Sequence, residues 1–154
     1  MSVLVLGLGN TLLCDDGVGV HVVRHIAGDP ATPAYVLPID GGTLGFRLMG
    51  ALTGAGAVIV VDAANLGEPP GTIRLLTGDM LARYVAGGSR ASAHEAGLVD
   101  LLTLVRLQGL MPRRLAVLGI QPQRIDWGEE LSDPVALAFP TACQAVIQTA
   151  ASWQ

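Results

Sequence analysis

Short apolar runs alternate with helical patterns along most of the chain. The runs predict strands at 2–8, 34–39, 57–61, 72–76 and 115–120, and amphipathic spacing predicts helices at 16–27, 44–52, 92–107 and 133–151. Continuous apolar runs are typical of parallel strands that are buried on both faces. Strands that alternate with helices indicate βαβ units. The pattern therefore predicts an α/β fold, a three-layer α/β/α sandwich around a mainly parallel sheet.

The run 72–76 is the exception in this alternation. It follows the turn Glu68-Pro69-Pro70-Gly71 after a short connection, which predicts one antiparallel edge strand. Two helix starts also carry local signals. Ser92 and Glu95 have the spacing of a capping box, and Asp133 followed by a proline predicts an N-cap with a first-turn proline. Pro140 should kink the last helix.

The first strand is followed by a glycine turn and two adjacent acids. The segment reads Gly7-Leu8-Gly9-Asn10 and then Asp15-Asp16-Gly17-Val18-Gly19. Ligands of open α/β sheets bind beyond the carboxyl ends of the strands, so the acids stand in a functional location. The alternative is that one of them only caps the helix that follows. A dinucleotide-binding turn is disfavoured, because Leu12 replaces its third glycine and the acids would repel a pyrophosphate.

Composition narrows the possible functions. The chain has 154 residues, which is enough for one domain over 1–154, and 51% of them are hydrophobic. The net charge of −4 disfavours a nucleic-acid partner. All nine basic residues are arginines, so P-loop and lysine chemistry are excluded. No apolar run is long enough to predict membrane insertion, and no basic segment opens the chain, so we expect a cytoplasmic protein.

The two cysteines, Cys14 and Cys143, have no metal-binding spacing. They predict neither a disulfide framework nor a structural zinc site. Cys14 lies next to Asp15 and Asp16 in the turn after the first strand, which we call the acidic turn. A reactive thiol at Cys14 is therefore a minor alternative.

Acids follow three of the predicted strands. Asp15 and Asp16 follow the first, Asp40 the second, and Asp62 the third. Each has a structural explanation of its own, such as an Asx turn at Asp40 before two glycines. Together at one edge of the sheet they would repel each other, and a cation or protonation must relieve this repulsion. Oxygen-rich clusters with one imidazole suit a divalent metal.

Three histidines could supply the imidazole. His21 and His25 have i, i+4 spacing, but they lie away from the apolar face of their helix, so we assign them to its polar side. His94 falls in the first turn of its helix if Ser92 is the cap. The helix dipole keeps an imidazole at that position neutral and able to bind a metal.

These residues resemble the hydrogenase maturation endopeptidases, which trim the C-terminal tail of the large subunit of [NiFe]-hydrogenases. The matching motifs extend almost from end to end. They are Gly7-Leu8-Gly9-Asn10, Leu13 with Asp15-Asp16-Gly17-Val18-Gly19, Asp40-Gly41-Gly42-Thr43, Val61-Asp62-Ala63, His94 with Gly97-Leu98, and Gly119-Ile120-Gln121-Pro122.

The resemblance implies that Asp16, Asp62 and His94 bind the metal and carry out catalysis. Some members have Glu where this chain has Asp16, and many have Gln where it has Glu95. The metal implied is nickel held by the precursor, for which other divalent ions can substitute. For substrate binding we select four residues of the matched motifs: Asn10, Asp40, Gly41 and Gly42.

The expected activity is that of a metal-dependent endopeptidase with a carboxylate-based site, resembling an aspartyl protease. The partner implied is the nickel-loaded large-subunit precursor, cut by a monomer. A non-catalytic maturation chaperone that uses the same trio to hold the precursor is the leading alternative. A nucleotide-binding α/β domain is a more distant one.

Overall fold

Five strands form one sheet in the computed structural model. The model describes the backbone of residues 1–43, 49–87 and 93–154, and the side chains of the last range from residue 98 onward. The strands are β1 (Val3–Leu8), β2 (Val36–Gly42), β3 (Ala57–Ala63), β4 (Ile73–Leu76) and β5 (Arg114–Ile120). They lie in the order β2-β1-β3-β5-β4.

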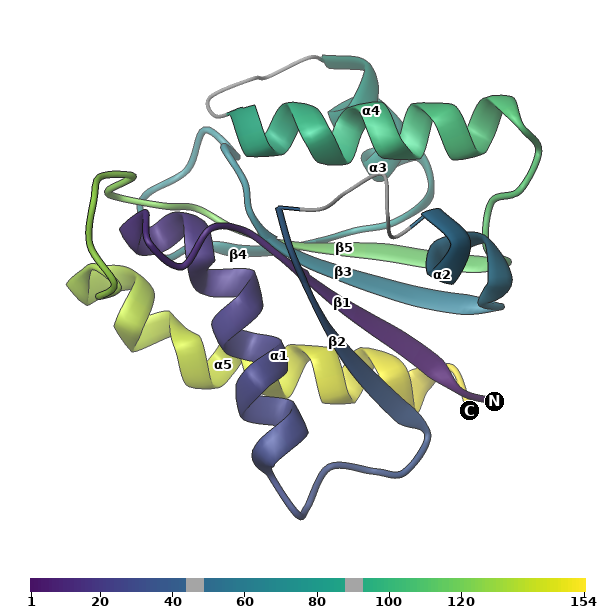
Figure 1. The fold of residues 1–154 in the computed structure, drawn as a ribbon, viewed down its shortest axis with the longest axis horizontal. Helices are drawn as coiled ribbons and strands as arrows, with labels where there is room; N and C mark the ends of the chain where they lie inside the picture. Colours follow the sequence, from purple (N-terminus) through teal and green to yellow (C-terminus); the bar gives the residue numbers. More distant parts are fainter. Residues whose placement is uncertain (44–48, 88–92) are drawn as a thin grey trace.

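The sheet is parallel except at one edge. β2, β1, β3 and β5 run in the same direction, and β4 pairs antiparallel with β5. Both the mainly parallel sheet and the antiparallel edge strand predicted at 72–76 are therefore confirmed (Figure 1).

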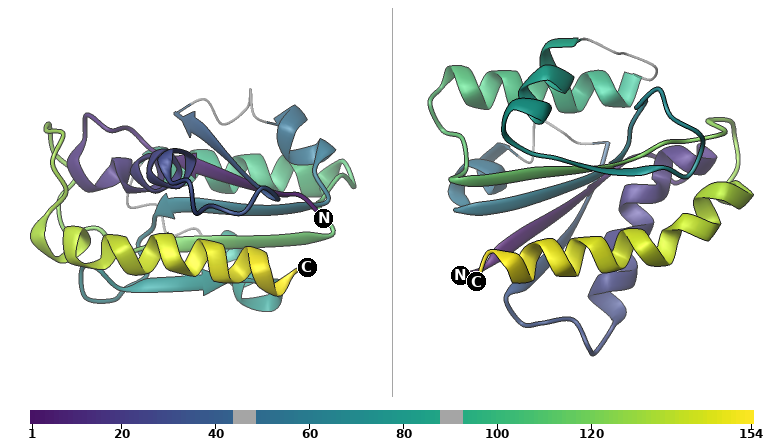
Figure 2. Two further views of the ribbon diagram at one scale, coloured as in Figure 1. Left: turned by 90° about the horizontal axis from the view of Figure 1, so that it is seen from below. Right: turned by 180° about the vertical axis from the view of Figure 1, so that it is seen from behind.

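Helices cover both faces of the sheet and complete three layers. They are α1 (Val18–Gly28), α2 (Met49–Gly54), α3 (Gly78–Gly87), α4 (Ala93–Leu107) and α5 (Asp133–Ser152), and a 3-10 turn, η1 (Cys14–Gly17), precedes α1. Figure 2 shows α1 and α5 on one face and α2, α3 and α4 on the other. The α/β/α sandwich predicted from the sequence is confirmed.

The alternation of side chains along the strands divides the core in two. Val3 and Val5 of β1 pack with α1 and α5, whereas Leu4 and Leu6 pack with α4 and its neighbours. The same alternation holds in β3, where Val58 joins the α4 side of the core. Even-numbered positions of β1 and β3 therefore face α4.

Some boundaries differ from the prediction. β2 continues through Asp40 to Gly42, so Asp40 does not end its strand. The helix α3 was not predicted, and Leu81 is its only buried residue. Ser132 rather than Asp133 occupies the N-cap position of α5. The helix runs through Pro140 as expected, and the kink there stays a prediction. The start of the predicted helix 44–52 and the capping box at Ser92 lie outside the described residues.

By length and composition alone, α5 could cross a membrane. No other helix in the described ranges meets that test. Its side chains Val135, Ala142, Val146 and Ala150 are buried against the sheet and α1. We therefore interpret α5 as a core helix of the sandwich.

Glycines allow α1 to approach the sheet closely. A side chain at Gly19 would collide with the carbonyl oxygens of Val61 and Leu8, and one at Gly7 would collide with the carbonyl oxygen of Gly19. Only glycine permits this contact, because the obstacles are backbone atoms that cannot rotate away. The start of α1 is therefore fixed against the ends of β1 and β3.

We predict that Gly19→Ala lowers the free energy of unfolding by at least about 2 kcal/mol, because the added methyl group overpacks a backbone contact. Gly28→Ala is the matched control, since open space surrounds Gly28 at the other end of the same helix. It should leave stability unchanged or raise it by up to about 1 kcal/mol. Urea unfolding of both variants measures the difference, and equal stabilities would contradict the close-packing account.

Candidate metal and active site

The turn between β1 and α1 has an unusual backbone. Gly9 has a φ of 134°, and a side chain there would collide with the carbonyl oxygen of Asp16. Cys14 has a φ of 49°, which a non-glycine residue rarely adopts. Backbone strain of this kind persists only where surrounding contacts enforce it, and it is frequent at functional sites.

Asp15 holds this turn against a distant segment. Its carboxylate is buried and accepts hydrogen bonds from the backbone amides of Gln123, Arg124 and Ser132 at 2.9, 3.0 and 2.7 Å. It also accepts one from the Ser132 hydroxyl at 2.6 Å. Neither η1 nor α1 has a side-chain cap, so the alternative in which an acid of this turn caps the helix is wrong.

These hydrogen bonds set the charge state of Asp15. Burial alone would raise the pKa of its carboxyl, but the bonds from the Ser132 hydroxyl and from the amides of Arg124, Ser132 and Gln123 outweigh it. The pKa therefore lies below the ordinary value of 3.8. Asp15 is a carboxylate at neutral pH with its acceptor capacity used by the protein.

Backbone hydrogen bonds reinforce the same attachment. The amide of Cys14 donates to the carbonyl of Gly128 at 2.7 Å, the amide of Gly128 donates to Leu12 at 2.9 Å, and the amide of Asp15 donates to Arg124 at 3.1 Å. We call residues 121–132 the pinned loop. Together with Asp15, these bonds fix the pinned loop beside the acidic turn.

Asp16, the next residue, is in a different state. Its side chain is buried, and Oδ2 accepts a hydrogen bond from the backbone amide of Asn10 at 3.0 Å. Its Oδ1 is buried and has no hydrogen-bond partner among the residues that the structure describes. An anionic oxygen in that position is costly unless a cation or a proton compensates it. Asp16 therefore fits the role of a metal ligand.

Asp62 lies at the end of the neighbouring strand. It is buried, it is the penultimate residue of β3, and it pairs with Gly119 of β5. Val58 and Val60 face α4, so the alternation of the strand turns Asp62 to the same side. The contact of Gly19 with Val61 brings the acidic turn to this point of β3. The structure thus brings Asp16 and Asp62 to one edge of the sheet.

His94 lies in the first turn of α4, as predicted. Figure 1 shows α4 running opposite to the parallel strands beneath it, so its first turn lies toward their carboxyl ends. Position 94 is four residues before Leu98, which is buried against the sheet. The side chain of His94 lies outside the described side chains, so its place in the trio stays a prediction.

Asp40 differs from the other acids. It is exposed, forms an ion pair with Arg24 at 2.9 Å, and accepts a hydrogen bond from the amide of Gly42 at 3.1 Å. The Asx-turn interpretation is therefore confirmed, and Arg24 supplies a cation for this carboxylate. Asn10, Asp40 and Gly42 line one open hollow of about 220 Å³ with Arg24, whereas Gly41 is buried and outside that lining.

The other two histidines do not join the carboxylates. His21 is half-buried, and its Nε2 is buried with no hydrogen-bond partner in the described part of the chain. Its pKa is lowered, chiefly by burial and then by Arg24, with Asp40 acting in the opposite direction. The ring of His25 packs edge-on against Phe139 at 5.6 Å. Within the described ranges, no three His, Cys, Asp or Glu side chains are grouped for a metal.

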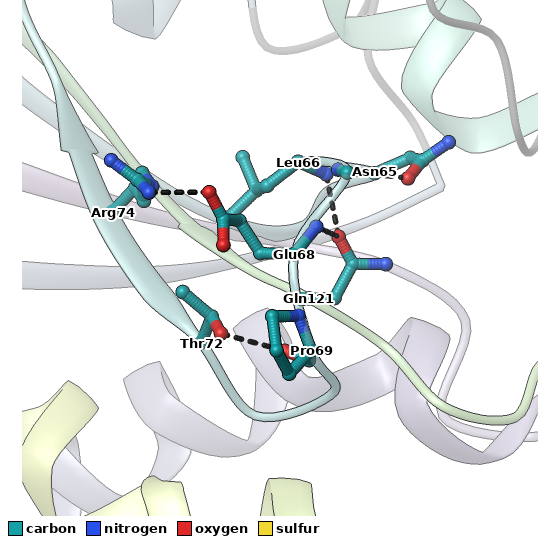
Figure 3. A network of polar contacts seen from close by, with 8 residues as sticks. Asn65, Leu66, Glu68, Pro69, Thr72, Arg74 and Gln121 are labelled. Atoms are coloured by element: carbon teal, nitrogen blue, oxygen red, sulfur yellow. Dashed lines mark hydrogen bonds and ion pairs between the residues drawn. The ribbon is translucent and has the colours of Figure 1, made fainter.

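Two residues that support the site were missed or undervalued. Ser132 carries no local signal, because its partner Asp15 is 117 positions away. Gln121 belongs to a matched motif, and its role is structural. Its Oε1 accepts hydrogen bonds from the amides of Leu66 and Glu68 at 2.6 and 3.4 Å, next to the Arg74–Glu68 ion pair at 2.5 Å (Figure 3). Gln121 thus anchors the segment that follows β3.

Comparison with known proteins identifies the family of the chain. The family model for hydrogenase maturation proteases of the HycI type matches residues 20–149. The chain belongs to the hydrogenase maturation protease family. The resemblance predicted from the motifs is therefore confirmed, and the protein is a protease.

Relatives and solved structures cover most of this maturation protease. It is 36% identical over 152 residues to the hydrogenase expression/formation protein HupD of Rhodobacter capsulatus, covering 98% of this chain and 72% of the relative. It is 31% identical to the hydrogenase 2 maturation protease of Escherichia coli over 96% of this chain and 89% of that one. The structure of the Escherichia coli hydrogenase maturating endopeptidase HybD superposes with a TM-score of 0.84 at 31% identity, covering 97% and 91% of the two chains.

We predict that Asp15→Asn lowers the free energy of unfolding by about 2 kcal/mol or more at pH 7, since hydrogen bonds to a buried charge are lost. The pKa of Asp15 is lowered by folding, so its stabilisation is present above pH 3.8 and is lost as the pH falls below that value. The gap between wild type and variant should therefore narrow in acid. Urea unfolding from pH 7 to pH 3 measures it.

Asp100→Asn is the control, because Asp100 is exposed on α4. It should match the wild type within about 0.5 kcal/mol across the range. A stability gap for Asp15→Asn that stays constant down to pH 3 would contradict the stated charge state.

Proposed function

We propose that this maturation protease is the endopeptidase that removes the C-terminal extension of a nickel-loaded [NiFe]-hydrogenase large-subunit precursor. Asp16, Asp62 and His94 form its site in this proposal. Family membership supports the activity and the class of partner. The single observation that carries the site assignment is the buried Oδ1 of Asp16, which has no described partner and lies at the sheet edge that also holds Asp62.

The nickel ion belongs to the substrate in this proposal. Two carboxylates and one imidazole suit a divalent ion, and three protein ligands leave coordination positions for groups of the precursor. Asp16 and Asp62 would hold the ion through carboxylate oxygens, and His94 through a ring nitrogen. A precursor that lacks the ion offers no cation to the buried Oδ1 of Asp16, which has no described partner. It should therefore bind poorly, which makes the protease a check on metal insertion.

Cleavage needs a group that accepts a proton from the attacking water. Asp16 is suited to this role, because one of its oxygens is fixed by the amide of Asn10 and the other has no described partner. Cys14 is not suited to be a nucleophile. It is buried, and its Sγ lies close to the backbone of Gly128. In this proposal water therefore attacks the peptide bond directly, without a covalent enzyme intermediate.

The alternative is a maturation chaperone that grips the precursor without cutting it. The matches to maturation proteases favour the enzyme.

We further propose that the protein acts as a monomer in the cytoplasm, where the precursor is matured. A hollow lined by Asn10, Asp40 and Gly42 beside the acidic turn is the proposed binding place for part of the substrate chain.

We predict that Asp16→Asn abolishes cleavage more completely than it weakens precursor binding. The amide can still coordinate weakly, but it cannot accept a proton. His94→Ala should weaken binding of the nickel-loaded precursor, because a metal ligand is lost. Cleavage rate by mass spectrometry and precursor affinity are measured on each variant, with circular dichroism to verify folding.

Asp100→Asn again serves as the control, since it removes one exposed carboxylate far along α4 from its first turn. Proportional loss of affinity and rate in Asp16→Asn would reduce Asp16 to a ligand. Efficient cutting of nickel-free precursor would contradict metal checking, and intact binding without any cutting by the wild type would favour the chaperone.

We predict that replacing both His21 and His25 with Gln leaves precursor processing and metal affinity within about twofold of the wild type. Phe139 and the exposed surface of α1 surround His25, and the described neighbours of His21 include no second metal ligand set. The same mass-spectrometric assay checks this. A tenfold loss in either quantity would mean that the wrong histidines were chosen.

A further inference from the structure

Large apolar side chains are exposed directly beside the acidic turn. Trp127 is 82% exposed, Leu12 is 49% exposed and Ile125 is 37% exposed. The amide of Gly128 donates to the carbonyl of Leu12 at 2.9 Å, so the two segments that carry these side chains lie side by side. We call Leu12, Ile125 and Trp127 the apolar rim.

The rim is held rigidly although it is exposed. Its loop is fixed by the four hydrogen bonds to the Asp15 carboxylate and by the backbone bonds of Cys14, Asp15 and Gly128. Gly128 of this loop has a φ of 154°, and a side chain at that position would collide with Sγ of Cys14. The glycine therefore lets the loop lie close to Cys14. An exposed tryptophan on a fixed loop loses little entropy when a partner covers it.

Exposed acidic residues are close to the rim in the sequence. The stretch 124–133 holds one cation, Arg124, and four exposed acids. These acids are Asp126, Glu129, Glu130 and Asp133. No ion pair neutralises any of these acids among the described residues. A surface with an apolar centre and an acidic border is complementary to an apolar socket bordered by Lys and Arg.

We infer that the apolar rim and its acidic border are the docking surface for the folded body of the protein substrate, with Trp127 as the anchor. The partner face is an apolar socket with a basic border, next to the scissile tail. The inference rests on the proposed function, which requires a folded protein to be held while its tail enters the site.

The position of the rim favours the substrate over a second copy of the chain. The rim adjoins the turn that carries Asp16, so whatever covers the rim also faces the site. A second copy seated there would border the entrance that the precursor needs. Three apolar side chains form a small patch, which suits a partner that must leave after the cut. Tryptophan is also the residue type most enriched among those that dominate binding energy.

The test compares Trp127→Ala with Leu107→Ala. Leu107 is 80% exposed and ends α4 at the opposite end of the sheet from the site, so both variants remove one exposed apolar side chain. With whole nickel-loaded precursor, Trp127→Ala should raise KM and Kd by about tenfold or more and change kcat by less than about twofold. Leu107→Ala should change none of these values.

Charge is tested with Asp126→Lys combined with Glu130→Lys. This variant should raise KM at low salt, and added salt should reduce the difference from the wild type, because screening weakens charge steering. Incorporation of 5-fluorotryptophan adds a direct readout. The chain has only two tryptophans, so the signal of Trp127 should shift on adding unlabelled precursor while that of the half-buried Trp153 should not.

The outcomes separate this inference from the proposed function. If the wild type cuts the precursor and Trp127→Ala leaves KM and Kd unchanged, the docking surface is overturned and the proposed function stands. Absence of cutting by the wild type would overturn the proposed function, while the Kd comparison still tests the surface. Self-association of the wild type that Trp127→Ala abolishes, without any change in precursor binding, would assign the rim to a second copy and overturn the inference.

Discussion

The hydrogen bonds of the Asp15 carboxylate are the constraint on which the site depends. Four bonds to Gln123, Arg124 and Ser132 join the turn after β1 to the loop before α5, across more than a hundred positions of sequence. They compensate the burial of the charge and lower the pKa of Asp15. They also hold Cys14 in its left-handed conformation and thereby orient the residue that follows Asp15. The proposed metal ligand Asp16 is positioned by this attachment.

Two adjacent aspartates thus have opposite environments because of the number of donors that reach them. The protein satisfies Asp15, whereas Asp16 receives one described bond and keeps a buried oxygen without a described partner. The glycines provide the second condition. Gly7, Gly9 and Gly19 let the acidic turn and the start of α1 approach the ends of β1 and β3 closely, where Asp62 lies. A fixed, tightly packed frame around the buried Oδ1 of Asp16 is what a site needs to select a cation.

Local patterns predicted most of the fold, and the family resemblance selected Asp16, Asp62 and His94 as the proposed ligands. Apolar runs marked the five strands, the short link before Thr72 predicted the antiparallel edge, and Asp62 was predicted at a strand end. The sequence did not reveal what depends on distant partners. Asp15 resembled a helix cap, because its donors at Gln123 and Ser132 are far from it in the sequence. Asp40 resembled a member of the acidic cluster, because its ion pair with Arg24 joins two different elements. The helix α3 was not predicted, since only Leu81 of its residues is buried.

The most direct test of the account is the anomalous scattering from crystals of the protease equilibrated with Ni²⁺. The account predicts one strong peak at the carboxyl edge of the sheet, about 2.0–2.2 Å from a carboxylate oxygen of Asp16, one of Asp62 and a ring nitrogen of His94. The hydrogen bonds of Asp15 should be unchanged in those crystals. A peak at His21 and His25, or an occupied site that leaves Asp16 uncoordinated, would contradict the claim that the acidic turn presents Asp16 as a metal ligand.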